Sequence, residues 1–358
     1  MRRMKTIALT TLLVICALGA ESFSLPPQPL ATLDLSRSSS PKVDGRLSIM
    51  NLAFLSNSLI AVSFCLATRE CSLLLVHWED GKLRVLAQSL ESLPSKSIHL
   101  TSFGQILTTP FGKSPAILYS SDLSRITQLP PLHYASQSGD TVAEPTEAGW
   151  ELFHLDSRLK LIRKGVGHVQ SVSNEAVVTR DGDVIRTETL QGNLLGSFKV
   201  TPKCFYEAQL AGDDRLIVSD CKMIRFVDFN GMERSRLSVP KGWGYASSSA
   251  NGKRVLFNYF SRKVSVLRSA GEIVTAVETL GMGIGDEMDN RQEVEVADVA
   301  TGKFCFDLRR SFAENSESAS QNADLSPSGQ FAAIVVGGVI SIYQLPAIFE
   351  TDRQPAAP

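Results

Sequence analysis

The sequence lacks an excess of charge of either sign. Its 36 Lys and Arg residues nearly balance 37 Asp and Glu residues, which gives a formal net charge of -1. A nucleic-acid-binding surface normally shows as a basic excess, so the composition argues against nucleic acid as a partner and against a polybasic membrane patch. Beyond the N-terminus, no apolar run reaches the roughly 20 residues needed to span a bilayer. We therefore expect the mature chain to be soluble.

Motifs of catalysis and metal binding are also missing. No CxxC or paired Cys/His spacing indicates a metal site, and no Gly-x-Ser-x-Gly sequence offers a hydrolase nucleophile. Asp181-Gly182-Asp183 lacks the further ligands of a calcium loop and is interpreted as a hairpin turn. We therefore predict no cofactor, no metal and no catalytic residue, and the question of enzyme activity stays open.

Residues 1–20 have the pattern of a secretory signal peptide. Three basic residues precede an apolar run from Ile7 to Leu18, which is followed by the small residues Gly19 and Ala20. We expect cleavage after one of these two residues and export to the periplasm or the extracellular space. Loss of the three basic residues takes the net charge from -1 to -4. Two alternatives stay open, an uncleaved membrane anchor and a lipid attached to Cys16.

The remainder of the chain repeats one small unit, seen most clearly from Asp324 to Leu345. A polar turn is followed by an apolar strand and then by an alternating strand that forms a hairpin. A unit of this size cannot bury its own faces, so neighbouring units must stack. The polar turns of successive units lie near Asn57, Gly104, Gly139, Asn174, Asp213, Gly252 and Gly329.

Strands without helical periodicity, at a spacing of about 40 residues, predict an all-β fold of the β-propeller type. The seven turns predict seven blades, with six or eight as alternatives. The last unit ends one strand short, and the strand Leu30–Leu35 can supply the missing outer strand and close the ring. The predicted organisation is a lead-in over 21–29, one propeller over 30–348, an insertion at 264–290 in blade six, and a disordered tail over 349–358. The polar segment Ser36–Gly45 is expected to be a loop.

Two turns carry a resemblance to a known class. The segment SPSGQ from Ser326 is similar to the Ser-Pro-Asp-Gly-Lys turn common in WD40-like, YVTN-type propeller repeats, as is ANGKR from Ala250. The resemblance covers the chain from about residue 30 to 348. No blade carries the Trp-Asp ending or the Gly-His start of the eukaryotic repeat signature. The resemblance is therefore to an architecture, and it transfers no specific function.

Five cysteines remain after removal of the signal, and an exported chain can keep disulfides. Cys204 and Cys221 lie on two predicted strands that flank one turn, so antiparallel pairing places them opposite each other. Cys65 and Cys71 flank a turn in the same way. We predict these two disulfides and interpret Cys305 as a buried core thiol.

Propellers usually bind through loops at one mouth of the central channel. The candidate binding residues are the aromatic Trp243 and Tyr245 and the acidic Asp286 and Glu287 of the insertion. The predicted function is an exported, monomeric scaffold that binds a protein or small ligand. The alternative is a propeller enzyme, lactonase- or lyase-like, with its site at the channel mouth.

Overall fold

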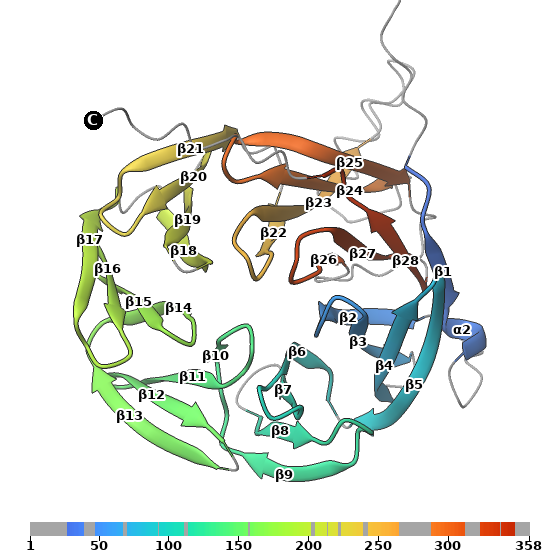
Figure 1. Cartoon of the computed structure of the whole chain (residues 1–358), viewed down its shortest axis with the longest axis horizontal. Helices are drawn as coiled ribbons and strands as arrows, with labels where there is room; N and C mark the ends of the chain where they lie inside the picture. Colours follow the sequence, from blue (N-terminus) through green and yellow to red (C-terminus); the bar gives the residue numbers. More distant parts are fainter. Residues whose placement is uncertain are drawn as a thin grey trace, which may run out of the picture.

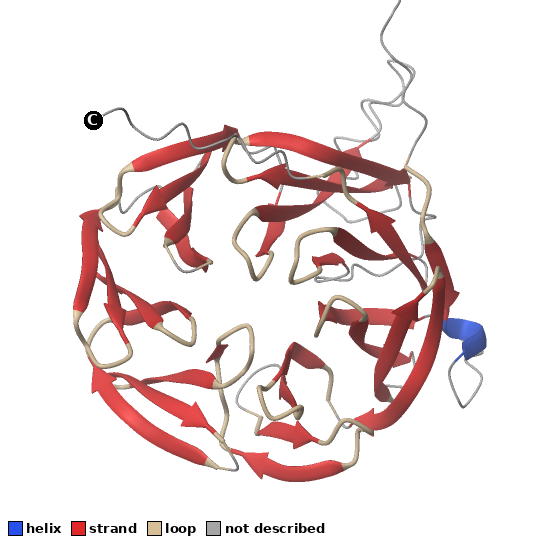
Figure 2. Ribbon diagram, in the orientation of Figure 1, coloured by secondary structure: helices blue, strands red, loops and turns tan. Residues whose placement is uncertain are grey.

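The repeats form seven four-stranded antiparallel sheets arranged in a ring, as a computed structural model of the protein shows (Figures 1 and 2). The all-β, seven-bladed propeller fold is thereby confirmed. The structure describes residues 27–38, 47–66, 70–91, 93–110, 114–156, 158–201, 205–212, 214–220, 223–238, 243–264, 288–311, 323–336 and 338–347.

Six of the seven blades use four strands that follow one another in the chain, with the first strand nearest the channel (Figure 1). Blade one consists of β2 (Leu47–Phe54), β3 (Leu59–Leu66), β4 (Cys71–Glu79) and β5 (Lys82–Glu91). Blade two consists of β6 (Ser95–Leu100), β7 (Ile106–Pro110), β8 (Ala116–Tyr119) and β9 (Arg125–Leu129). Blade three consists of β10 (Tyr134–Ala135), β11 (Thr141–Thr146), β12 (Gly149–Leu155) and β13 (Leu159–Gly165). Blade four consists of β14 (His168–Val172), β15 (Ala176–Asp181), β16 (Val184–Thr189) and β17 (Leu194–Lys199).

The second half of the ring continues in the same way. Blade five consists of β18 (Phe205–Ala211), β19 (Arg215–Asp220), β20 (Met223–Asp228) and β21 (Glu233–Ser238). Blade six consists of β22 (Trp243–Ser248), β23 (Arg254–Val264), β24 (Met288–Asp298) and β25 (Lys303–Ser311). Blade seven takes β26 (Ala323–Leu325), β27 (Phe331–Val336) and β28 (Val339–Gln344) from the C-terminal end of the chain.

Blade seven is completed by a strand from the other end of the sequence. β1 (Ala31–Asp34) pairs antiparallel with β28, so that Ala31 lies opposite Ile342 and Asp34 opposite Val339. The predicted closure of the ring by an N-terminal strand is confirmed.

The chain after β1 differs from the expected loop. Leu35–Ser38 forms a single helical turn, α2. The carboxylate of Asp34 accepts hydrogen bonds from the backbone N–H and the hydroxyl of Ser36 at 3.0 and 2.6 Å, which caps this turn. Leu35 is fully buried in the core between blades seven and one. The loop prediction is therefore wrong for these residues, because a local cap and one buried side chain stabilise a turn too short to show periodicity.

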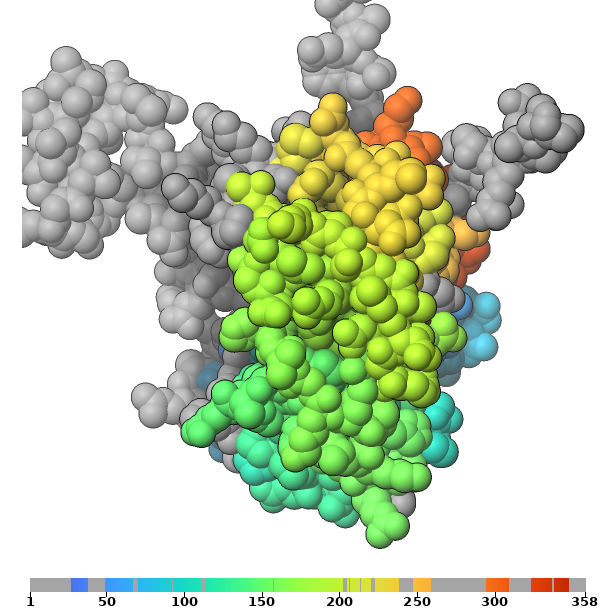
Figure 3. Space-filling view, turned by 90° about the vertical axis from the view of Figure 1, so that its left-hand side faces the viewer, coloured from blue at the N-terminus to red at the C-terminus, as the bar shows by residue number. Residues whose placement is uncertain are grey.

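The core is divided among the blade interfaces. The described residues form seven hydrophobic clusters, and each one joins two neighbouring blades. The cluster between blades six and seven, for example, places Val296 and Phe306 against Ile334 and Tyr343. Figure 3 shows the outer wall, where blades three, four and five stack directly on one another. Each blade is thus stabilised by burial against both neighbours.

The turns between the first and second strands of the blades lie on one face, which we call the turn face, together with the turns between third and fourth strands. We call the opposite face the connection face. Six of the seven sequence-predicted turn positions belong to these first turns, and Asp213 lies outside the described residues, between Gly212 and Asp214.

Hydrogen bonds link these first turns or the strands beside them from blade to blade. Ser328 N–H donates to Asn57 Oδ1 at 3.0 Å across the closure between blades seven and one. Asn174 Nδ2 lies 2.7 Å from Ser138 Oγ between blades three and four. Ser102 N–H donates to Asp140 Oδ1 at 2.9 Å between blades two and three. The turn face is therefore held as a connected unit.

Within the described part of the chain, no helix is long and apolar enough to cross a membrane.

Candidate functional site

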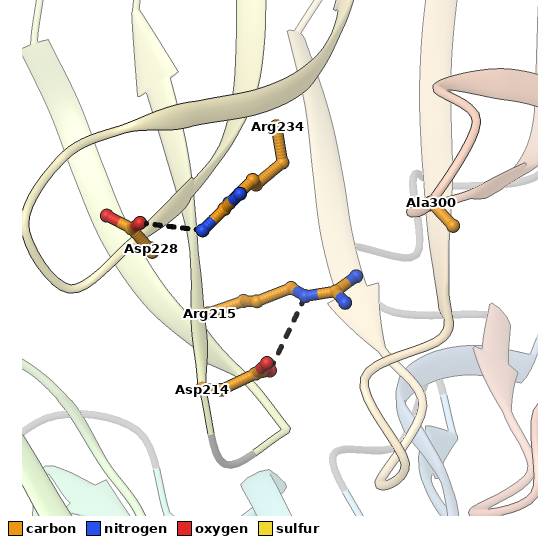
Figure 4. A pocket seen from close by; sticks show the side chains of 5 residues that line it. All are labelled: Asp214, Arg215, Asp228, Arg234 and Ala300. Carbon is orange, nitrogen blue, oxygen red and sulfur yellow. Dashed lines mark hydrogen bonds and ion pairs between the residues drawn. The ribbon is translucent and has the colours of Figure 1, made fainter. Parts of the chain in front are cut away.

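A pocket of about 430 Å³ opens between blades five and six (Figure 4). Asp214 and Arg215 come from the first turn of blade five and the start of β19, while Asp228 ends β20. Arg234 lies on β21, and Ala300 lies in the turn between β24 and β25 of blade six. All five residues are at or near turns of the turn face, so the pocket belongs to that face.

Two ion pairs line this pocket, and they differ in character. Arg234 Nη2 lies 3.1 Å from Asp228 Oδ2, and Asp228 Oδ1 accepts the backbone N–H groups of Asn230 and Met232 at 3.0 and 2.9 Å. Asp228 is thereby committed to its own turn. Arg215 Nε lies 3.4 Å from Asp214 Oδ1, and the Asp214 side chain is 74% exposed. The second pair is loose and screened by solvent.

The aromatic candidates lie on the inner strand of blade six. Trp243 begins β22, opposite Phe260 of β23, and Tyr245 lies opposite Asn258. Since β22 runs from the connection face to the turn face, Trp243 is at the connection-face end. Asp286 and Glu287 lie outside the described residues, so the structure does not test whether they join the aromatic pair.

The hairpin next to Trp243 is longer than its blade requires. The pairing of β23 with β24 continues past Phe260, from Ser261 opposite Arg291 to Val264 opposite Met288. β22 begins only at Trp243, so these four pairs extend beyond the inner strand on the connection face. Residues 265–287, which make up most of the predicted insertion, connect the two strands and lie outside the described residues.

A set of titratable side chains gathers at the inner strands of blades three and five. His133 Nδ1 lies 2.8 Å from Glu144 Oε2. Burial, and then the negative charges of Glu144 and Glu207, raises the pKa of Tyr134 above its ordinary value. Burial also raises the pKa of Glu207. Glu144 of blade three and Glu207 of blade five thus both act on the Tyr134 hydroxyl, and carboxylates in such environments are candidates for acid–base chemistry.

Three of the five cysteines after the signal segment lie among the described residues. Cys65 and Cys71 form a disulfide across the turn between β3 and β4. Cys204 and Cys221 lie outside the described residues, so their predicted bridge is not tested. Cys305 is a free thiol, half-buried against the core between blades six and seven, and burial raises its pKa. In the described ranges, no group of three or more His, Cys, Asp or Glu side chains could hold a metal ion.

Solved structures of other proteins share the overall fold of this chain. The chain superposes on "Structure of U3-55K" with a TM-score of 0.56 and 12% identity, covering 89% of this chain and 100% of that one. It superposes on "Crystal structure of RRP9 WD40 repeats" with a TM-score of 0.55 and 12% identity, covering 90% and 99% of the two chains. The fold is that of a WD40-like propeller.

A third propeller match comes from "Crystal Structure of Mitotic Checkpoint Complex", with a TM-score of 0.51, 12% identity and coverage of 92% of this chain and 98% of that chain. No family model matches the sequence, and no curated protein does either. At these identities the WD40-like likeness concerns the fold alone.

Sequence reasoning missed the pocket between blades five and six entirely. Its residues are spread from position 214 to 300 and form no motif, because stacking of two blades brings them together. The one sequence signal near the pocket was the turn pair Asn230-Gly231. It predicts the hairpin turn that lies between Asp228 and Arg234.

Proposed function

We propose that this protein is an exported WD40-like scaffold that binds a protein partner at the connection face of blade six. The observation that carries the proposal is the hairpin of β23 and β24, which extends beyond its own blade beside Trp243. β23 and β24 have 11 residues each, whereas the second and third strands of the other blades have at most eight and nine, so a blade does not need the additional pairs.

Physical reasons support a protein as the partner. A projecting hairpin has strand edges with unpaired backbone groups, which a second chain can pair with. Aromatic residues at its base, such as Trp243 and Tyr245, are the usual anchors of protein interfaces. One structurally similar chain is part of the Mitotic Checkpoint Complex, which is a multi-protein assembly.

Export is supported by two observations. The sequence begins with the pattern of a secretory signal, and Cys65 and Cys71 are joined by a disulfide, a bond that persists in oxidising compartments. Mass spectrometry of the protein purified from its native host is expected to find a mature N-terminus at Ala20 or Glu21. An N-terminus at Met1, or a lipid on Cys16, would contradict cleavage after Gly19 or Ala20.

The binding site is tested by photo-crosslinking in the native host. A benzoylphenylalanine in place of Trp243 is expected to yield one discrete cross-linked protein, and deletion of residues 265–287 is expected to abolish it. The matched control is the same group in place of Leu86, which is 59% exposed on the outer strand of blade one. Equal cross-linking from both positions would contradict a site at blade six.

A propeller enzyme is the second candidate, favoured by the cluster of His133, Tyr134, Glu144 and Glu207. A carboxyl group with a raised pKa beside a tyrosine suits proton transfer in lactone hydrolysis or in β-elimination from uronate polysaccharides. Turnover of either substrate class that is lost in Glu207→Gln, with the melting temperature unchanged, would establish this function. Failure to turn over either class would leave the scaffold as the better account.

A further inference from the structure

The pocket between blades five and six has the chemistry of a carboxylate-binding site. We propose that it binds an acidic side chain of a protein partner, with Arg215 as the principal anchor. The proposal depends on the proposed scaffold function only in that the ligand belongs to a protein, because this pocket is on the turn face and the blade-six hairpin projects from the other.

Arg215 supplies the donors. Its Nε atom is directed at Asp214, while its terminal guanidinium nitrogens extend across the opening towards the Ala300 turn (Figure 4). The Arg215 side chain is 30% exposed, so it is partly withdrawn from water and still accessible to a ligand. A guanidinium presents two parallel N–H groups that match the two oxygens of a carboxylate.

The acidic residues of the pocket do not compete for these donors. Asp228 is occupied by two backbone N–H groups and by Arg234. The Asp214 side chain is mostly in solvent, and its 3.4 Å contact is with Nε of Arg215. The two terminal nitrogens of the guanidinium are therefore available to a ligand. Across the pocket, Ala300 presents only a methyl group, and its backbone N–H is bonded to Asp298 Oδ1 at 2.9 Å. Ala300, the residue by which blade six lines the pocket, therefore adds no carboxylate, and the Asp298 carboxylate is bonded within its own turn.

Another blade interface shows how this chain satisfies such an arginine internally. Arg163 of blade three lies 2.7 Å from Glu188 of blade four, and both side chains are about one-fifth exposed. Arg163 also lies over the Trp150 ring at 4.8 Å. Among the described residues, Arg215 has no comparable contact with the next blade. A carboxylate from a partner would give it the geometry that Glu188 gives Arg163.

The surroundings specify the ligand further. Met232 lies in the turn that leads into β21, two residues before Arg234, and is 59% exposed. An apolar side chain beside the acidic one can pack against Met232 and remove both from water. The ligand class is thus a peptide segment in which a Glu or Asp is adjacent to a large apolar residue.

The test uses the mature protein and a fluorescein-labelled peptide of alternating Glu and Leu. Fluorescence anisotropy is expected to show saturable binding that weakens with salt, and at least about tenfold weaker binding when Gln replaces Glu. Arg215→Gln is expected to weaken binding by about tenfold as well. Arg236→Gln is the matched control, because Arg236 is on the same blade, is 65% exposed, and is not among the pocket residues.

Three results would overturn the proposal. They are absence of binding by the wild-type protein, equal affinity for the Glu and Gln peptides, and equal effects of Arg215→Gln and Arg236→Gln. Arg215→Lys keeps the charge but loses the paired donors, and it is expected to bind more weakly than wild type with an unchanged melting temperature. Deletion of 265–287 is expected to leave peptide binding intact, so a failure of the pocket is distinguishable from a failure of the blade-six site.

Discussion

At the scale of single residues, close packing of neighbouring turns requires glycine at position 252. Its φ is +63°, and a Cβ atom there would lie 2.6 Å from the carbonyl oxygen of Ala211 in blade five. Gly104 has the same kind of backbone conformation, with φ +75°, but open space around it. A substitution at Gly104 therefore introduces backbone strain alone, whereas one at Gly252 adds a steric conflict with the neighbouring blade.

We expect Gly252→Ala to lower the free energy of unfolding by about 3 kcal/mol and Gly104→Ala by about 1 kcal/mol. The difference between the two losses in the free energy of unfolding measures the cost of moving the turns of blades five and six apart. Urea denaturation of the two variants and the wild type checks the values. Equal losses at both positions would mean that the turns of blades five and six separate without cost.

At the scale of elements, β1 and α2 together act as the closing unit of blade seven. β1 covers the edge of β28, while Ala31 and Leu35 are buried in the core between blades seven and one. Without them, β28 presents an unpaired edge and the core loses two side chains. An exposed strand edge also favours association with other chains.

We expect a chain that begins at Ser36 to melt at least about 5 °C below one that begins at Pro27, and to associate in a concentration-dependent manner. Calorimetry and light scattering check the two effects. The chain that begins at Pro27 retains β1 and serves as the control. Identical melting temperatures would show that the outer strand of blade seven is dispensable.

At the scale of the whole molecule, buried ionisable groups at several blade interfaces make stability depend on pH. Between blades one and two, burial raises the pKa of Glu91 to about 7, although Ser95 and Tyr119 donate hydrogen bonds to it. At the closure, burial raises the pKa of Asp324 to about 6, against the hydrogen bond from Phe54 N–H at 2.8 Å. Burial lowers the pKa of His99 to about 4.

The direction of each effect follows from proton linkage. Glu91 and Asp324 hold their protons more tightly in the folded state, so their contribution is largest below the unfolded pKa values near 4 and declines as pH rises to about 7. His99 acts in the opposite direction, because the unfolded chain takes up a proton as pH falls from 6.5 towards 4. Between pH 6.5 and 7, Glu91 is the main contributor.

We expect the free energy of unfolding of Glu91→Gln to rise relative to that of the wild type between pH 4.5 and pH 7. The total change in this difference is expected to be on the order of 3 kcal/mol. The glutamine keeps one acceptor oxygen for one of the two hydroxyls and can donate from its NH2 group to the other, and it has no charge to bury. Denaturation curves of both proteins at a series of pH values check the difference. A difference that is constant with pH would show that Glu91 ionises equally well in the folded and unfolded states.

The sequence predicted the ring because the fold repeats local signals. Turns such as those at Gly104 and Gly329, and the alternation of strands such as Val339–Gln344, are properties of short segments. The strand at Ala31–Asp34 was predictable because one unit was visibly one strand short. Trp243 was predicted as a binding residue from its type and from its place at the entry to blade six beside the insertion, and it lies on β22 opposite Phe260.

The pocket at Arg215 was not predictable for a physical reason. Whether an arginine is satisfied within the molecule depends on which residue the next blade places opposite it, as the contrast between Glu188 and Ala300 shows. No local pattern carries that information, since the two positions are 25 residues apart for Arg163 and Glu188 and 85 apart for Arg215 and Ala300. Function in a repeat fold therefore resides in departures from the repeat.

The pairing of β1 with β28 joins residues more than 300 positions apart, Asp34 with Val339. Among the strands of the ring the ribosome makes β1 first and β28 last, so β1 has no partner until β28 has emerged. Six blades can form as their four consecutive strands emerge, but the seventh waits for both ends of the chain. Closure is therefore a late event after synthesis, and until then the nascent protein presents an open arc with two uncovered blade surfaces that a chaperone can recognise.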